Sequence, residues 1–309
     1  GELLDESEST NNDFKIPFNI NNLDEGTVEK LARTNEKPAM KVLFDYDFSI
    51  GEHEITCDEF GDEECSSDDD PVSNVTFFDA ALFANERSKK EGLDSAYVYT
   101  KKVMDDKGHC IGLENFEFKT DVNAYRLPTE AEWVLVANQN WEPQESWNST
   151  NSDFKKNKVC SIESMNGPVC DMAGNVAEWV NDWMGPFADT TVTNFIGSES
   201  KRTQGERVVK GGSYRNNPQD MYVYTRGDIY TVVSSTKAEY VGFRLAFGAI
   251  PHARTLEIDR VTTSGDNSLQ ASLEAMKGVT GSYLTKLALR DDVTGNLTFV
   301  DYGGGYFDL

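Results

Sequence analysis

A short segment of the chain places two carboxylates on either side of a glycine-containing turn, an arrangement that can hold a metal ion. Asp171 and Glu178 are the carboxylates, and the backbone carbonyls of Gly174 and Val176 lie between them. Ca²⁺ takes roughly six to eight oxygen ligands, which include carboxylates and backbone carbonyls. The segment therefore predicts a Ca²⁺ site; the alternative is a turn whose polar groups are satisfied without a metal.

The cysteines favour disulfides over catalysis or zinc binding. Cys57 lies close in sequence to Cys65, Cys160 lies close to Cys170, and Cys110 stands apart. No Cys-x-x-Cys spacing occurs, which disfavours a zinc knuckle or a thioredoxin-type site. We expect two short disulfides and one free thiol, the alternative being five reduced cysteines in a cytosolic protein.

No other set of residues forms a catalytic constellation. The histidines, His53, His109 and His252, are widely separated, and Ser213 has no matched histidine. Carboxylates are abundant, but no pair stands out from the acidic background as the acid and base of a hydrolase. The sequence therefore predicts no catalytic residue.

The net charge of −24 and the pI near 4.4 narrow the classes of partner. A field of this sign repels phosphate backbones, which argues against nucleic acid, and it favours cations, although solubility alone also accounts for it. No apolar run is long enough to span a membrane, and no signal peptide is visible.

Two capped helices and several short strands are the elements that must position these residues. Thr76 and Asp79 predict a capping box for a helix that ends at Gly92, and Thr129 and Glu132 predict a second capping box. Hydrophobic alternation predicts strands at residues 40–48, 96–100, 111–118, 207–210 and 240–246.

Changes in composition divide the chain into three regions. We expect a flexible acidic N-terminal segment at 1–38, a main domain at 39–250 and a C-terminal extension at 251–309. In the extension, the spacing of Leu269, Leu273 and Met276 predicts a short helix. A hairpin is expected from strands at 284–290 and 297–302.

Four segments of the main domain match one family in the same order. They are Ala124-Tyr-Arg-Leu-Pro-Thr-Glu-Ala-Glu-Trp133, Asp171-Met-Ala-Gly-Asn-Val-Ala-Glu-Trp179, Val209-Lys-Gly-Gly-Ser-Tyr214 and Tyr240-Val-Gly-Phe-Arg-Leu245. The chain thereby resembles the formylglycine-generating enzyme (sulfatase-modifying factor) domain family. The resemblance implies an α+β fold, a variant of the C-type lectin fold with little regular secondary structure and, here, a small C-terminal helix and hairpin extension.

Residues 41–250 are similar, more closely, to a bacterial paralogous family of predicted lipoproteins of unknown function that lacks the catalytic cysteines. In those proteins the domain precedes a β-propeller-like region, and the C-terminal hairpin of this chain is similar to the entry into it. This resemblance favours an extracytoplasmic location, in the periplasm or at the cell surface, and allows a lipid anchor upstream.

The resemblance also implies structural calcium. In the family, the positions of Gly174 and Val176 contribute carbonyl ligands, and Asp171 replaces a residue that is commonly asparagine. Trp183 would then pack beneath this loop together with Trp179. A second calcium site in the family lies near a loop asparagine, for which Asn151 is the best match.

The family's oxidases bind copper through two cysteines that follow the Gly-Gly-Ser motif. Soft thiolates select Cu(I). In this chain Asn216 stands at the first position, the stretch for the second holds no cysteine, and none of the cysteines follows Cys170. A branch that binds iron through histidines does not fit either, because the chain has no His-x-x-x-His pair. We therefore predict no copper and no oxidase activity.

A groove remains where the family's active site would be. Aromatic and polar side chains of this kind suit a carbohydrate or peptide ligand, although the tyrosines are equally explained as packed strand residues. Within the groove, Arg226 is expected to pair with Asp228 or Asp220. The candidates are Tyr214, Arg215, Asn216, Asn217, Tyr222, Tyr224, Arg226 and Asp228.

These observations favour a non-catalytic, calcium-stabilised domain that binds a carbohydrate, peptide or protein ligand, a pseudoenzyme on a familiar scaffold. The alternative is an enzyme of the same superfamily with altered, non-copper chemistry. A third reading is a structural module that presents a neighbouring propeller.

Overall fold

The computed structural model describes residues 14–16, 32–62, 65–162, 168–185, 187–199, 205–227 and 233–256, and strand segments at 280–281, 286–290, 297–301 and 307–308. The chain separates into two compact units, Gly1–Glu257 and Ile258–Leu309. The candidate site residues all belong to the first unit.

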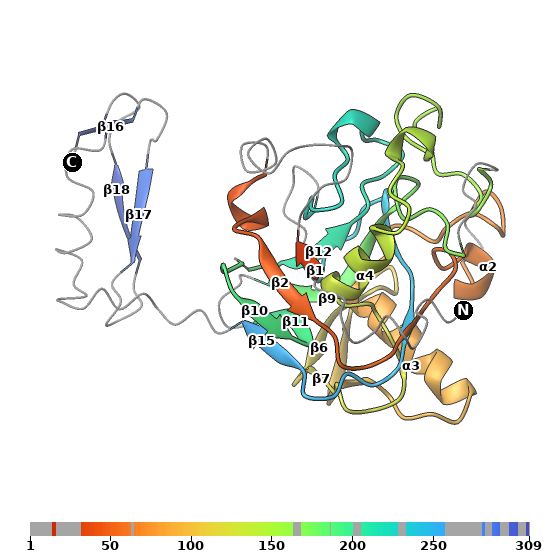
Figure 1. The fold of residues 1–309 in the computed structure, drawn as a ribbon. Helices are drawn as coiled ribbons and strands as arrows, with labels where there is room; N and C mark the ends of the chain where they lie inside the picture. The colour runs from red at the N-terminus through yellow and green to blue at the C-terminus, as the bar shows by residue number, and fades with distance from the viewer. Residues whose placement is uncertain are drawn as a thin grey trace. The chain divides into compact units, whose positions relative to one another are not determined.

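The centre of the first unit is a three-stranded mixed sheet. Strand β9 (Ala177–Trp183) lies between β12 (Arg207–Lys210), which is antiparallel to it, and β13 (Val241–Phe243), which is parallel. β9 and β12 are labelled in Figure 1. Nearly every residue of these strands is buried, because other parts of the chain cover both faces of the sheet. Three of the four sequence motifs, those at 171–179, 209–214 and 240–245, include residues of these strands.

Short strands surround this sheet in small pairs and triplets, as expected for a fold with little regular structure. They are β2 (Met40–Leu43) with β1 (Phe14–Ile16) and β10 (Thr191–Thr193); β14 (Ala246–Phe247) with β3 (Ser49–Ile50) and β8 (Tyr125–Arg126); β11 (Phe195–Ser198) with β15 (Arg254–Leu256); β4 (Tyr97–Val98) with β7 (Glu117–Phe118); and β5 (Lys101–Met104) with β6 (Cys110–Glu114).

The strand predicted over 40–48 is wrong in its length. β2 ends at Leu43, and two residues further on the backbone N–H of Asp45 donates to the side chain of Asn194 (3.1 Å) instead of a neighbouring strand. The alternation beyond that point reflects ring packing. The rings of Phe44, Tyr46 and Phe48 contact one another, with centroids 5.8–6.2 Å apart.

Both predicted helices and their caps are confirmed. In α3 (Phe77–Lys90) the Thr76 side chain accepts from the backbone of Asp79 while Asp79 accepts from the backbone of Thr76. In α4 (Glu130–Ala137) Thr129 and Glu132 do the same. Such reciprocal bonds satisfy N–H groups that the first helical turn leaves without partners. The short helix α2 (Cys57–Phe60) and the 3-10 turns η1 (Thr34–Glu36), η2 (Pro143–Glu145) and η4 (Pro218–Asp220) complete the set of described helical elements.

The apolar core packs α3 against the central sheet. Phe77 lies edge-on to Trp179, with centroids 6.2 Å apart, and Phe243 is fully buried in the same cluster. The predicted disulfides are also confirmed: Cys57 is bonded to Cys65 and Cys160 to Cys170, and Cys110 is a buried free thiol.

In the second unit, β17 (Lys286–Arg290) and β18 (Leu297–Asp301) form the predicted antiparallel hairpin, and β16 (Thr280–Gly281) pairs with β19 (Phe307–Asp308). The helix predicted from Leu269, Leu273 and Met276 lies outside the described residues. Among the described helices none has the length and apolar character needed to cross a membrane.

Candidate functional site

The loop that precedes β9 is held in an unusual backbone conformation. Asp171, Gly174 and Asn175 all have positive φ angles of 54°, 78° and 49°. A side chain at Gly174 would collide with the carbonyl of Trp147, so only glycine fits there. The loop therefore turns sharply beside the segment that contains Asn151.

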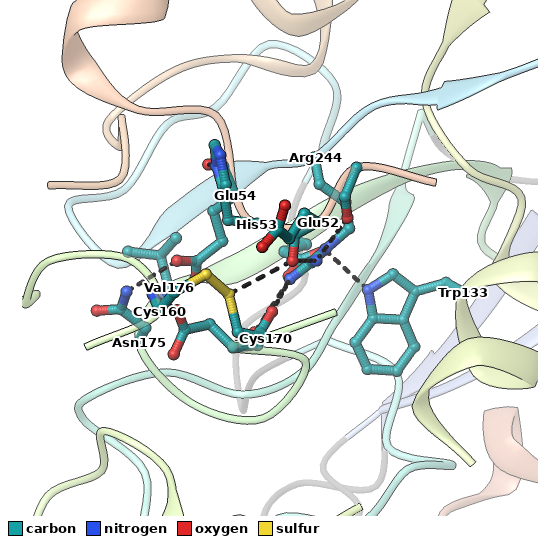
Figure 2. A network of polar contacts seen from close by, with 12 residues as sticks. Glu52, His53, Glu54, Trp133, Cys160, Cys170, Asn175, Val176 and Arg244 are labelled. Atoms are coloured by element: carbon teal, nitrogen blue, oxygen red, sulfur yellow. Dashed lines mark hydrogen bonds and ion pairs between the residues drawn. A yellow bond between two sulfur atoms is a disulfide. The ribbon is translucent and has the colours of Figure 1, made fainter. Parts of the chain in front are cut away.

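Three buried carboxyl groups surround this loop. Asp171 belongs to it and Glu178 lies at the start of β9. Glu54 reaches the loop from a distant part of the chain, accepting from the backbone of Val176 (3.0 Å) and the side chain of Asn175 (2.8 Å; Figure 2). Burial, followed by repulsion from Asp171 and Glu178, raises the pKa of Glu54 well above its usual value. Burial likewise raises the pKa of Asp171.

Arg244 is the cation at the centre of the cluster (Figure 2). Its guanidinium donates to both carboxylate oxygens of Glu178, at 2.7 Å each, and to the carbonyls of Cys170 (3.0 Å) and Asp171 (3.2 Å). Trp133 Nε1 donates to the same carboxylate at 2.8 Å. Arg244 thus ties β13 to the loop and satisfies every oxygen of Glu178.

The residues predicted to bind Ca²⁺ therefore differ in whether their oxygen atoms already accept hydrogen bonds. The carbonyl oxygens of Gly174 and Val176 accept no hydrogen bond from any described residue, and Asp171 accepts one from the backbone of Cys160 (2.5 Å). By contrast, the carboxylate of Glu178 is fully used by Arg244 and Trp133. Of the predicted ligands, Asp171 and the two carbonyls thus keep lone pairs that no described residue uses, whereas Glu178 stabilises the loop through its ion pair.

Asn151 closes a turn. Its Oδ1 accepts from the backbone of Asn148 (2.9 Å), and its Nδ2 donates to the carbonyl of Ser146 (2.9 Å). A metal ion could also be held by a group of three or more His, Cys, Asp and Glu side chains whose ligand atoms lie within 4.8 Å of one another. Among the described residues, only Cys160, Cys170 and Asp171 form such a group. Those two cysteines are joined in a disulfide, which leaves the carboxylate as the only donor of the three.

Glu54 is the residue that sequence reasoning missed. It lies in the acidic stretch Gly51-Glu-His-Glu54, far from the loop in sequence, and nothing local distinguishes it from other acidic residues.

The tryptophan contacts also differ from the prediction that Trp183 packs beneath the loop together with Trp179. Trp133 contacts Glu178, whereas Trp183 stacks on Arg207, with 3.4 Å between the guanidinium and the ring centroid.

Asn216 completes a tight turn after the Gly-Gly-Ser motif. Its side-chain oxygen accepts from the backbone N–H (2.9 Å) and the hydroxyl (3.0 Å) of Ser213. Its own carbonyl accepts from the backbone of Ser149 at 3.0 Å. Neighbouring Asn217 caps η4 by accepting from the backbone of Gln219 (3.1 Å). Both amides are thus engaged in local structure.

The other groove candidates are divided between the surface and the interior. Tyr214 is buried, and the exposed Arg215 lies over the ring of Tyr240 at 5.2 Å. Tyr222 and Tyr224 stack in parallel with centroids 5.0 Å apart. The hydroxyl of Tyr224 is buried without a hydrogen-bond partner among the described residues.

Arg226 lies in the interior and is not paired with Asp220, so that alternative was wrong; the other expected partner, Asp228, lies outside the described residues. Its guanidinium is 2.8 Å from Glu130 and 4.1 Å from the ring centroid of Phe187. The contact with Glu130 is ionic, because the groups are not aligned for a hydrogen bond. Glu130 also attracts buried Lys210 (3.4 Å), whose pKa burial lowers to about 8.

A small cavity remains beside Asn216, Met221 and Tyr222, with a volume of about 20 Å³. That volume holds roughly one water molecule. In this conformation the cavity is too small for a sugar ring. A ligand at this face would therefore contact the surface around Asn216, whose chain neighbours Arg215 and Asn217 are exposed.

Comparisons with known proteins place this geometry in a family. The model of the sulfatase-modifying factor enzyme 1-like domain family matches residues 60–249, more than half of the chain. The chain belongs to this family.

Solved structures agree on the fold. The Treponema denticola variable protein 1 is similar with a TM-score of 0.57 and 23% identity, over 69% of this chain and 88% of that one. PvdO from Pseudomonas aeruginosa is similar with a TM-score of 0.50 and 17% identity, over 71% and 87%. The first unit accordingly has the formylglycine-generating-enzyme-like variant of the C-type lectin fold.

One further protein is similar to this chain in sequence. The protein named chaperone protein LppX of Paenibacillus barcinonensis is 30% identical over 44% of this chain and 62% of its own length. The chain thus spans less than two thirds of that relative.

Proposed function

We propose that this domain is a non-catalytic binding module of the sulfatase-modifying factor family. The turn closed by Asn216 carries the proposal. A copper centre of the family's kind needs two thiolates after the Gly-Gly-Ser motif. At the first of these positions a carboxamide accepts two hydrogen bonds from Ser213, so the position serves to hold the turn.

The cysteines support the same conclusion. Two disulfides use four of them, and the fifth, Cys110, is buried and donates to the carbonyl of Gly112 at 3.3 Å. Burial raises the pKa of this thiol, which disfavours the thiolate that would bind a metal. No thiolate pair is therefore available for Cu(I).

We propose further that Ca²⁺ stabilises the loop before β9, held by the Asp171 carboxylate and the carbonyls of Gly174 and Val176. The charge balance supports this. Glu54, Asp171 and Glu178 are buried together, and Arg244 is the guanidinium that offsets them. Burying carboxylates without a counter-charge is costly, and a divalent cation supplies the missing positive charge.

The ligand we propose is a carbohydrate, peptide or protein that contacts the rim near Arg215 and Asn217. A relative that bears the name of a chaperone favours a protein partner. An extracytoplasmic location, with a lipid anchor upstream, agrees with two disulfides, which persist in oxidising compartments. It also agrees with the millimolar Ca²⁺ at which extracellular modules are saturated.

The test is a screen of the whole chain against glycan and peptide arrays, with Ca²⁺ and with a chelator. We expect at least one class of ligand to be retained in Ca²⁺. An Arg215→Ala/Asn217→Ala variant should lose it, while Glu86→Ala, on the exposed face of α3, should keep it. Absence of binding to every ligand in both conditions would argue against a binding module and for the structural alternative.

A further inference from the structure

A second, larger pocket lies on a part of the first unit that the proposed function does not use. It has a volume of about 420 Å³, within the usual range for small-molecule sites. Phe116, Phe118 and Trp183 supply apolar walls, and Asn181, Ser198 and Arg207 supply polar ones. These residues lie in or next to strands β7, β9, β11 and β12, all four of which are labelled in Figure 1.

Arg207 in this pocket is buried but only partly satisfied. Its exposed fraction is 2%, and its guanidinium lies between the ring of Phe77 (3.9 Å) and that of Trp183 (3.4 Å). One nitrogen, Nη1, donates to the carbonyl of Asn181. The other two, Nε and Nη2, have no hydrogen-bond partner among the described residues.

Unpartnered nitrogens alone do not set Arg207 apart, because Nε and Nη2 of Arg226 also lack hydrogen bonds. The other buried arginines differ from Arg207 in having a carboxylate partner. Arg126 is paired with Glu132 at 2.6 Å, Arg226 with Glu130 at 2.8 Å and Arg244 with Glu178 at 2.7 Å. No ion pair of this kind involves Arg207 in the described part of the chain. Burial lowers its pKa to about 9, because nearby Tyr97 and Asp182 do not offset the loss of hydration.

We propose that this pocket binds the carboxylate of a small aromatic acid, which pairs with Nε and Nη2 of Arg207. These two nitrogens form one edge of the guanidinium, and such an edge matches the two oxygens of a carboxylate. The aromatic part of the ligand packs against Phe116, Phe118 and Trp183. The ligand supplies the anionic partner that the other three buried arginines find within the chain.

The charge of the pocket selects among anions. Glu199 also lines it, is half-buried and makes no ion pair in the described part of the chain. One guanidinium beside one carboxylate favours a monoanion over a phosphate dianion, because the second negative charge would face Glu199. This site is separate from the groove beside Asn216, so the inference stands apart from the proposed function.

The experiment uses the whole chain with phenylacetate as the probe and phenylacetamide as its neutral counterpart, followed by calorimetry and ligand-observed NMR. A probe of this size should bind with a dissociation constant of roughly 1 mM. We expect phenylacetate to bind about tenfold more tightly than phenylacetamide, because only the anion pairs with Arg207. Equal binding of the two probes, or binding of neither, would overturn the proposal.

Two variants locate the binding. Glu199→Gln removes a repulsive charge at a half-buried position and should tighten phenylacetate binding by roughly threefold. Glu86→Gln, the matched change on α3, should leave it unchanged. Arg207→Lys keeps the charge but lacks the paired N–H edge, and should weaken phenylacetate binding by about tenfold.

Arg207→Lys loses the stacking on two rings, and if this variant does not fold, the Glu199→Gln result decides the matter. If Glu199→Gln and Glu86→Gln bind phenylacetate alike, the anion does not occupy this pocket and the inference fails. Unchanged affinity in a folded Arg207→Lys protein would contradict it equally.

Discussion

Arg244 and Arg207 are both buried arginines beside the central sheet, but their guanidinium groups have different partners. Arg244 meets a carboxylate and several carbonyls, so that its donors are satisfied within the chain. Arg207 meets aromatic rings, has two unpartnered nitrogens and lines an open pocket. The contrast separates a charge that is paired with a buried carboxylate from one that has no ion pair in the described part of the chain.

Replacing each arginine by methionine tests this contrast with the largest expected effect. Arg244→Met leaves Glu178 buried without its partner and should lower the free energy of unfolding by about 3–5 kcal/mol. Arg207→Met leaves no carboxylate without its partner and should lower the free energy of unfolding by less than about 2 kcal/mol. Urea denaturation of both variants measures the difference; equal losses would remove the distinction between the two centres.

The two disulfides provide a second comparison. Cys160→Ala/Cys170→Ala and Cys57→Ala/Cys65→Ala each open a short loop, and each should cost about 2–3 kcal/mol of stability. Only the first should also weaken Ca²⁺ binding, because the backbone of Cys160 donates to Asp171. Calorimetric titration of both double variants with Ca²⁺ checks this, and parallel changes in affinity would show that the disulfide does not support the loop.

The pH dependence of stability tests a third buried group. Burial, reinforced by Glu130, raises the pKa of Asp182 to about 8. Since this folded-state pKa lies above the unfolded value of about 3.9, the group destabilises the fold progressively as the pH rises from about 4 to 8. Asp182→Asn keeps an acceptor for the backbone of Glu130 and should flatten that decline.

Thermal unfolding of the wild type and the Asp182→Asn variant across this range gives the measurement. Superimposable profiles would mean that Asp182 is not responsible for the decline. Glu114→Asn, an exposed change on β6, is the control and should leave the slope as it is.

The smallest effect is expected at Tyr224, whose buried hydroxyl has no partner in the described part of the chain. Tyr224→Phe removes an unpaired polar group and keeps the stack on Tyr222, so stability should change by less than about 0.5 kcal/mol. A loss of stability well above this value in chemical denaturation would show that the Tyr224 hydroxyl makes a hydrogen bond, and would contradict the prediction.

The sequence predicted those parts of the fold that depend on neighbouring residues. The capping pairs Thr76–Asp79 and Thr129–Glu132 lie within one helical turn, and the disulfide partners lie within one loop, so their types and spacing suffice. The family motifs supplied the overall fold in the same way, because their order along the chain is specific.

The contacts that define the sites could not be predicted, because they join distant segments. Glu54 reaches Val176 and Arg244 reaches Glu178 only when the sheet is assembled, and Arg226 turns inward to Glu130 instead of along the chain. The pocket of Arg207 is built in the same manner, from strands that are far apart in sequence. Periodicity and spacing carry no information about such pairs.

The central claim, that the family's scaffold persists here without its copper centre, is tested most directly by a single metal-competition experiment. The purified chain is titrated with Ca²⁺ and, separately and without oxygen, with Cu(I) held by a competing chelator. The account predicts one Ca²⁺ per chain, weakened at least tenfold by Asp171→Ala, and no removal of Cu(I) from the chelator. Stoichiometric capture of Cu(I), with no response to Ca²⁺, would contradict it.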